Sequence, residues 1–218
     1  MKNLIKATVV LSTILVIGSS NLRAEMITIK IESKVLDVHY PGIAGLINVG
    51  DIVTGSYTYD STIDDIYPDD PGVGVYKYNS PPNGIELTVN GYVFKTDADN
   101  VNFEIAILDN LGLKDYYIIH SYNNLPVSMG SYDYNITEIS WQLEDDSRTA
   151  FSSDVLPTTA PVLENFYVGK INIEFGSGNM LFRSEVTKVE LIPEPCTILL
   201  LGLGAVLVRK STKTVARR

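Results

Sequence analysis

The chain of 218 residues carries 26 acidic and 17 basic side chains, a formal net charge of −9 at neutral pH. This excess of negative charge argues against nucleic acid as a partner, because the phosphate backbone is itself anionic. With two histidines and one cysteine, the chain is too poor in nitrogen and sulfur ligands for a structural zinc site, and an internal disulfide is excluded.

Residues 1–24 have the three-part pattern of a secretory signal peptide. Lys2 and Lys6 make a positive start, residues 7–18 are apolar, and Ala24 ends a polar segment with a small residue suited to cleavage. The alternative is a transmembrane anchor. The apolar stretch has 12 residues, whereas a spanning helix needs about 20. We therefore predict a cleaved signal peptide over residues 1–24 and export through the secretion machinery.

Residues 25–191 are expected to form one all-β domain, an antiparallel β-sandwich or jelly-roll-like fold. Apolar and polar residues alternate along most of this segment, which is typical of strands with one buried face. Asn90-Gly91 predicts a tight hairpin, and residues 176–179 predict another turn. A short helix is expected over residues 147–155. The predicted strands are centred on residues 27–31, 53–59, 85–89, 92–94, 103–107, 116–119, 139–143, 168–175 and 186–191.

Two acidic loops are candidate calcium sites, because Ca²⁺ prefers carboxylate and carbonyl oxygens. The first loop carries Asp60, Asp64, Asp65, Asp69 and Asp70, and the second carries Asp97 and Asp99. Residues 144–146 form a third acidic cluster. The first loop lacks the spacing of an EF-hand, and the alternative is a set of solvated turns in which Asp accepts hydrogen bonds from nearby backbone N–H groups. Calcium is thus the one cofactor that the sequence suggests.

The sequence predicts no enzyme. No Gly-x-Ser-x-Gly elbow surrounds a serine, and no two of the many carboxylates stand apart as a glycosidase pair. His39 and His120 are expected on strands, at the surface or in the core. Aromatic residues could form a sugar-stacking face, or could simply favour strands. They are Tyr57, Tyr59, Tyr76, Tyr78, Tyr116, Tyr117, Tyr122, Tyr132, Tyr134 and Trp141.

Residues 192–218 differ in pattern from the rest of the chain. The motif Pro193, Glu194, Pro195 precedes the uncharged residues 196–208, and a basic tail over residues 209–218 begins with Arg209 and Lys210. A helix of 13 residues is about 20 Å long, shorter than a bilayer core of about 30 Å. It would span a membrane only with local thinning or snorkelling, with the basic tail held on the cytoplasmic side as a stop. The alternative is a buried final strand or helix of the domain.

This segment resembles the PEP-CTERM sorting signal of exported proteins of Gram-negative bacteria. The Pro-Glu-Pro motif, the Leu- and Gly-rich apolar run and the basic end follow in the same order. The family commonly has Ser or Thr after the motif, where this chain has Cys196. The segment over residues 53–60 is also similar to a G-S-F-T-Y-D strand that recurs in such proteins. The resemblance implies that an exosortase-like enzyme processes an inner-membrane-anchored intermediate, and that the product reaches the cell surface or the extracellular space.

Trimming at both ends changes the charge of the protein. Cleavage of the signal peptide removes three basic residues, and loss of residues 192–218 removes five basic residues and one acidic residue. The remaining domain has 9 basic and 25 acidic residues, a net charge of −16. We expect a non-enzymatic structural or adhesive component of the cell envelope, associated with exopolysaccharide or a biofilm matrix. The alternatives are a carbohydrate-binding module, which calcium could assist, and a secreted hydrolase.

Overall fold

A computed structural model describes residues 26–193 of the chain. The described part consists of β-strands, turns and two 3-10 helices of three residues each, which confirms the all-β prediction. The predicted signal peptide, Glu194, Pro195, the apolar run over 196–208 and the basic tail all lie outside the described residues. Of the sorting motif, Pro193 is described, and it is exposed.

Twelve strands occur within residues 26–193. They are β1 (Met26–Val38), β2 (Ile52–Asp60), β3 (Val73–Tyr78), β4 (Gly84–Val89), β5 (Tyr92–Lys95), β6 (Phe103–Leu111), β7 (Lys114–Ser121), β8 (Val127–Met129), β9 (Tyr132–Tyr134), β10 (Ile136–Asp145), β11 (Val168–Phe175) and β12 (Asn179–Ile192). The 3-10 helices are η1 (Pro41–Ile43) and η2 (Leu163–Asn165). The predicted strands are confirmed, and β3, β8 and β9 were not predicted.

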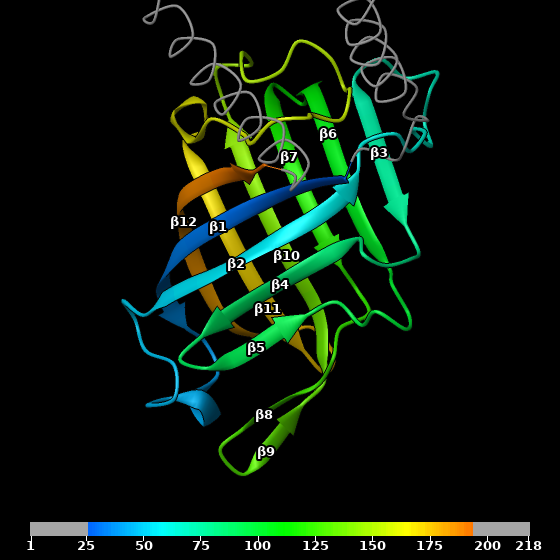
Figure 1. Ribbon diagram of the computed structural model, residues 1–218. Helices are drawn as coiled ribbons and strands as arrows, with labels where there is room; N and C mark the ends of the chain where they lie inside the picture. Colours follow the sequence, from blue (N-terminus) through cyan, green and yellow to red (C-terminus); the bar gives the residue numbers. More distant parts are fainter. Residues whose placement is uncertain (1–25, 194–218) are drawn as a thin grey trace, which may run out of the picture.

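Ten strands form one continuous antiparallel sheet in the order β3-β6-β7-β10-β11-β12-β1-β2-β4-β5, and β8 and β9 form a separate hairpin. The sheet curls, so that β1, β2, β4 and β5 cross in front of β6, β7, β10 and β11 (Figure 1). β12 pairs with both β11 and β1, and each pairing contains a register shift. Such irregularities bend a strand. The fold is therefore sandwich-like, but its two layers are the halves of one sheet.

Aromatic side chains from the two halves meet in the core. Trp141 of β10 lies with its ring centroid 5.4 Å from both Tyr57 of β2 and Tyr117 of β7. The hydroxyl oxygens of Tyr57 and Tyr117 are hydrogen-bonded at 2.9 Å. Burial raises the pKa of both tyrosines well above the usual value, so both hydroxyls stay protonated. The strand alternation seen in the sequence thus places one face of each strand in a shared aromatic interior.

The expected helix over residues 147–155 is wrong, because this segment is irregular. The carboxylate of Asp145, at the end of β10, accepts hydrogen bonds from the backbone N–H groups of Ser147, Thr149 and Ala150 at 2.7, 2.8 and 3.0 Å. These hydrogen bonds hold the residues after β10 in a turn.

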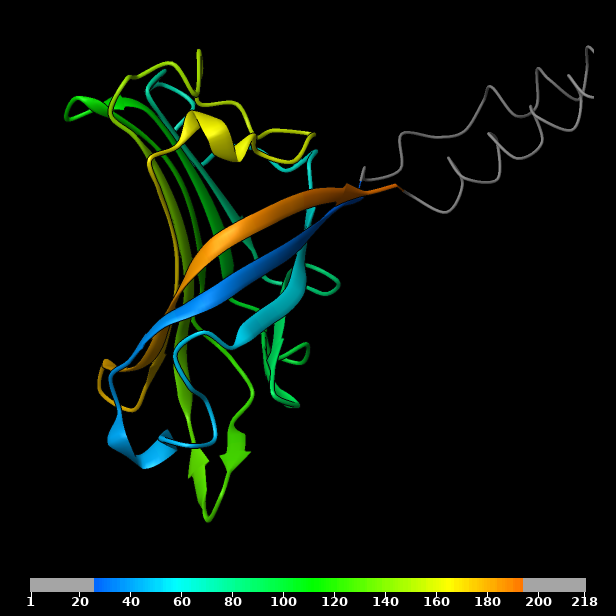
Figure 2. The ribbon, with the colours of Figure 1, turned by 90° about the vertical axis from the view of Figure 1, so that its left-hand side faces the viewer.

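The two ends of the domain lie together. β1 and β12 are antiparallel neighbours, and Thr28 pairs with Ile192. Figure 2 shows both strands, in blue and orange, extending toward the same end of the molecule. The start of the first strand and the end of the last strand therefore lie next to each other.

Candidate functional site

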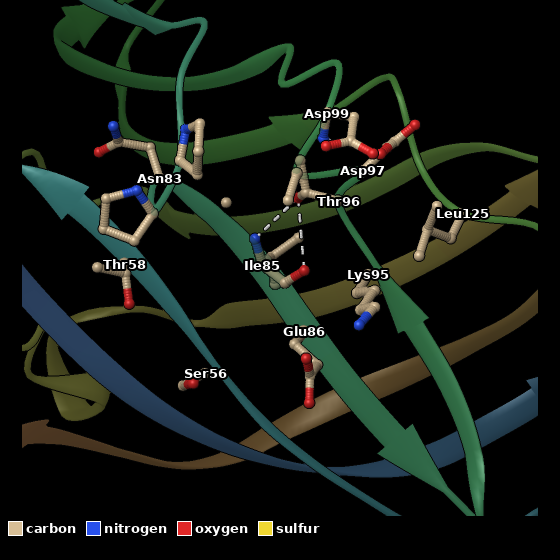
Figure 3. Close-up of a pocket in the computed structure, with 14 residues that line it drawn as sticks. Ser56, Thr58, Asn83, Ile85, Glu86, Lys95, Thr96, Asp97, Asp99 and Leu125 are labelled. Carbon is tan, nitrogen blue, oxygen red and sulfur yellow. Dashed lines mark hydrogen bonds between the residues drawn. The ribbon is translucent and has the colours of Figure 1, made fainter.

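A groove of about 480 Å³, lined by both polar and apolar residues, lies on the outer face of β2, β4 and β5. Ser56 and Thr58 of β2, Glu86 of β4 and Lys95 of β5 line it (Figure 3). The neighbouring residue Tyr57 is buried in the core. Because successive side chains of a strand point to opposite faces, Ser56 and Thr58 point outward into the groove.

Three of these side chains form a row across adjacent strands. Ser56 is directly opposite Glu86 in the β2–β4 pairing, and Glu86 is directly opposite Lys95 in the β4–β5 pairing. Within the described part of the chain, none of the three side chains makes a hydrogen bond or an ion pair. Their polar atoms are therefore available to a ligand.

Two loops form the walls of the groove. In the loop before β4, the side-chain oxygen of Asn83 accepts a hydrogen bond from the backbone N–H of Asp60 at 2.8 Å. The side-chain NH₂ of Asn83 donates to the backbone carbonyl of Ser80 at 2.9 Å. In the loop after β5, the Asp97 carboxylate accepts the backbone N–H of Asp99 at 3.0 Å. Both walls are thus held by side-chain hydrogen bonds to backbone, which limits how far they can move.

A chain of buried hydroxyl and amide groups supports the groove from below. The Thr96 hydroxyl accepts the backbone N–H of Ile85 at 2.9 Å and is bonded to the Ser121 hydroxyl at 2.8 Å. The Ser121 hydroxyl in turn donates to the side-chain amide oxygen of Asn124 at 2.7 Å. Figure 3 shows the bonds between Thr96 and Ile85. This network ties the β4–β5 end to β7, so the groove is largely preformed.

The groove is negatively charged and lacks aromatic side chains among its lining residues. Glu86, Asp97 and Asp99 supply three carboxylates, against a single ammonium group from Lys95. The hydroxyls of Ser56 and Thr58 can both donate and accept hydrogen bonds. Such a lining suits a hydroxyl-rich ligand that is neutral or positively charged.

Three acids of the first loop act as acceptors for backbone donors. Asp60 accepts from the N–H of Thr62 at 2.9 Å, and Asp70 accepts from the N–H of Gly72 at 3.1 Å. Asp65 accepts from the N–H of Tyr67 at 3.0 Å and of Val75 at 2.8 Å. The other two acids, Asp64 and Asp69, are exposed. No three His, Cys, Asp or Glu side chains of residues 26–193 come together as a group that could hold a metal ion, and calcium stays a prediction.

The first acidic loop covers an edge of the sheet. β3 is the last strand on its side of the order, so one of its edges has no strand partner among residues 26–193. There, the Asp65 carboxylate accepts the N–H of Val75, and the N–H of Ile66 donates to the Val75 carbonyl at 3.0 Å. An uncovered edge invites pairing with another chain. The loop therefore protects the edge by satisfying its backbone groups.

The other acids predicted from the sequence have separate places. Asp97 and Asp99 lie in the groove wall. In the third cluster, the ammonium of Lys114 lies 2.9 Å from a Glu144 carboxylate oxygen and 3.2 Å from one of Asp146. The groove residues Ser56, Glu86 and Lys95 were missed. Their outward positions can be read from strand alternation, but the adjacency of β2, β4 and β5 cannot.

Of the two alternatives for the aromatic residues, the sugar-stacking face does not hold for most of them. Seven of the ten side chains are buried, namely Tyr57, Tyr59, Tyr76, Tyr78, Tyr117, Tyr134 and Trp141. Among the rest, Tyr122 is 39% exposed and Tyr132 is 67% exposed. They lie outside the groove, and Tyr132 is on β9. The aromatic content of the strands therefore builds the core.

Both histidines are partly exposed and lie beside carboxylates. His120 Nδ1 is 2.7 Å from a Glu138 carboxylate oxygen, and the hydrogen bond with His120 lowers the pKa of Glu138. The His120 ring stacks on Tyr122 with centroids 5.4 Å apart. His39 contacts Asp37. These contacts agree with the expectation of strand and strand-end histidines at the surface.

Comparison of the chain with models of protein families, with curated proteins and with solved structures gave no match. Within residues 26–193, no helix is long and apolar enough to cross a membrane.

Proposed function

We propose that the protein is an exported, non-enzymatic component of the cell envelope, routed by a C-terminal PEP-CTERM signal. The secretion machinery would translocate the chain, and the segment over residues 196–208 would hold it in the inner membrane for a time. An exosortase-like enzyme would then remove the tail and release the domain to the cell surface or the extracellular matrix, as a structural or adhesive partner of exopolysaccharide in a biofilm.

The observation that carries this proposal is the place of the motif relative to the sheet. β1 begins at Met26, just after the predicted cut at Ala24, and β12 ends at Ile192, just before Pro193. Cleavage at both places would leave every strand pairing of the described domain intact. In the sequence, the two predicted signals thus lie on either side of the described domain.

The chemistry of the motif supports the proposal as well. Proline fixes its own backbone φ angle, removes an N–H donor and pushes the preceding residue toward an extended conformation. The sequence Pro193-Glu194-Pro195 therefore favours an extended segment, which a protease cleft can bind. Glu194 adds one negative charge that a basic subsite could recognise.

Mass spectrometry of the protein purified from cells that carry the processing enzyme tests this proposal. We expect an N-terminus at Glu25 and loss of the basic tail, and we expect the tail to be retained in cells that lack the enzyme. The substitution Glu194→Ala should slow removal of the tail, whereas Lys213→Ala, in the tail but far from the motif, should not. A mature protein that still ends at Arg218 would contradict the routing.

The polar groove favours carbohydrate binding as a second candidate function. The row formed by Ser56, Glu86 and Lys95 offers a hydroxyl, a carboxylate and an ammonium group with no partner within the described domain. Hydroxyl-rich sugars donate and accept hydrogen bonds with all three kinds of group. Binding at this groove would give the exported domain its contact with a polysaccharide matrix.

A further inference from the structure

We propose that the groove over β2, β4 and β5 binds a polysaccharide segment that contains amino sugars, and that it rejects uronate polymers. This inference rests on the proposed function, because it names the class of polysaccharide that the exported domain contacts. It assigns a site to residues that no motif in the sequence marks.

The dimensions of the row fit a short saccharide. Neighbouring strands of a sheet lie about 4.8 Å apart, so the row from Ser56 through Glu86 to Lys95 extends about 10 Å across three strands. This is the length of a disaccharide. The walls at Asn83 and at Asp97 to Asp99 stand at one end of the same strands.

The side chains of the row, Ser56, Glu86 and Lys95, can bind one sugar unit at each end of the row. The Glu86 carboxylate can accept hydrogen bonds from two hydroxyl or amino groups, and the Lys95 ammonium can donate to ring or hydroxyl oxygens. The Ser56 hydroxyl can do either. Since Asn83 is already bonded to Asp60 and Ser80, its side chain shapes the wall and contributes less to recognition.

The charge of the groove selects between classes of polysaccharide. Three carboxylates, from Glu86, Asp97 and Asp99, oppose the single positive charge of Lys95. The domain around them has 25 acidic and 9 basic residues. A uronate polymer would place further carboxylates in this field, and like charges repel. An amino sugar would place its ammonium group against Glu86 or Asp99, where a charge-assisted hydrogen bond forms.

The preformed geometry favours binding without rearrangement. The hydrogen bonds among the side chains of Thr96, Ser121 and Asn124 fix the base of the groove. The wall residue Asp97 is held by its bond to the N–H of Asp99. A ligand therefore does not have to order the site, which reduces the entropic cost of binding. Because the selecting charges are exposed to solvent, the affinity should fall as salt is added.

Calorimetric titration of the purified exported protein with three tetrasaccharides of equal length tests the inference. The probes are a glucosamine tetramer, a glucose tetramer and a galacturonic acid tetramer. We expect the glucosamine tetramer to bind most tightly and the galacturonic acid tetramer to give no heat. The double substitution Glu86→Gln and Asp99→Asn should weaken binding of the glucosamine tetramer at least about tenfold, because two charge-assisted contacts become neutral.

Matched variants separate the groove from the general acidity of the domain. The double substitution Asp64→Asn and Glu164→Gln removes the same charge from exposed positions outside the groove lining, and it should leave the affinity within about twofold of the unmodified protein. The substitution Tyr132→Ala should also leave it unchanged. Emission from Trp141, which is fully buried and is the only tryptophan, checks that each variant is folded.

Several outcomes would overturn the inference. These are an affinity that is unchanged in the groove variant, an equal loss in the charge-matched control, a loss caused by Tyr132→Ala, tighter binding of the uronate tetramer, or no binding of any tetramer. Binding is measured on purified protein and does not depend on how the chain is routed. The termini found by mass spectrometry do not depend on the groove, so the two proposals can fail separately.

Discussion

The carboxylate of Asp145 is the main fixed point of the long loop that follows β10. The residue is 4% exposed, and its two oxygens accept hydrogen bonds from the side chain of Ser147 and from three backbone N–H groups. Burial raises its pKa, but these hydrogen bonds outweigh burial and lower the pKa to about 2. Directly opposite on β7, the buried carboxylate of Asp115 accepts the N–H groups of Asn110 and Phe151. The hydrogen bonds that Asp145 and Asp115 accept thus hold the loop at this end of the sheet.

The substitution Asp145→Ala should lower the free energy of unfolding by about 1–3 kcal/mol, because three part-buried backbone N–H groups lose their acceptor. Urea unfolding followed by Trp141 emission measures this change. Glu164→Ala is the control, because Glu164 is exposed and makes no side-chain hydrogen bond within the described domain. A similar loss in both variants would show that the loop does not depend on Asp145.

The pKa of Asp145 also predicts a pH dependence. A carboxyl whose pKa is lower in the folded state than its unfolded value of about 3.9 stabilises the fold above that pH. The contribution is lost as the pH falls from about 4 through the folded pKa of about 2. Urea midpoints measured between pH 5 and pH 2 should therefore fall more steeply for the natural protein than for Asp145→Asn. Parallel curves for the two proteins would contradict the assignment.

The acidic loop between β2 and β3 is best understood as a cover for the edge of the sheet. Three of its acids, Asp60, Asp65 and Asp70, accept hydrogen bonds from backbone N–H groups of the loop itself and of β3. Each of these acceptors satisfies a backbone donor that would otherwise need water, which is the usual role of Asp in turn-rich loops. The exposed acids Asp64 and Asp69 add charge, which discourages pairing of this edge with another chain.

The substitution Asp65→Ala should therefore have two effects. The free energy of unfolding should fall by about 1–2 kcal/mol, because the N–H groups of Tyr67 and Val75 lose their acceptor. Self-association should also rise with concentration, because the β3 edge opens. Urea unfolding and sedimentation velocity measure the two effects. Asp64→Ala, which removes an equal charge but no hydrogen bond of the described domain, should change the stability by less than about 0.5 kcal/mol.

The prediction of separate elements succeeded where the signal was local. Asn90 and Gly91 have φ angles of 50° and 83°, as the two-residue turn of the β4–β5 hairpin requires. β3 was missed because it follows directly on the acidic loop and its six residues include Gly74. The helix expected over residues 147–155 did not form, and the backbone N–H groups of Ser147, Thr149 and Ala150 instead hold an irregular loop against Asp145.

For the molecule as a unit, the proximity of its two ends has the widest consequence. β1 and β12 are paired along most of their length, so both processing points would lie at one end of the domain. The β8–β9 hairpin lies far from the end of β12, as Figure 1 and Figure 2 show. The groove on β2, β4 and β5 faces outward from the sheet and would stay open to the surroundings.

We expect residues 25–193, expressed without the leader and the tail, to fold as one cooperative unit. The ten-stranded sheet and the hydrophobic core that the structure describes lie within these residues. The urea midpoint of this fragment, measured by Trp141 emission, should match that of the processed protein from cells. A broad, non-cooperative transition would mean that a part of the flanking segments belongs to the domain.

The groove could be predicted from the sequence only in part. Strand alternation predicts that Ser56, Thr58 and Glu86 point away from the core, and it is right for all three. It does not predict that β2 and β4 are neighbours, since β3 separates them in the chain and pairs with β6 on the far side of the sheet. The site arises from this strand order.

The sequence by itself determined the strand content, the acidic surface, the tight hairpin at Asn90-Gly91 and the two candidate sorting signals, because each depends on residues close together in the chain. Tertiary structure alone decided that a single sheet curls into two layers through β12, that most of the aromatic residues form the core, and that the acids of one loop cover an edge. These outcomes depend on contacts between strands that are distant in sequence, and no local pattern records which strands will meet.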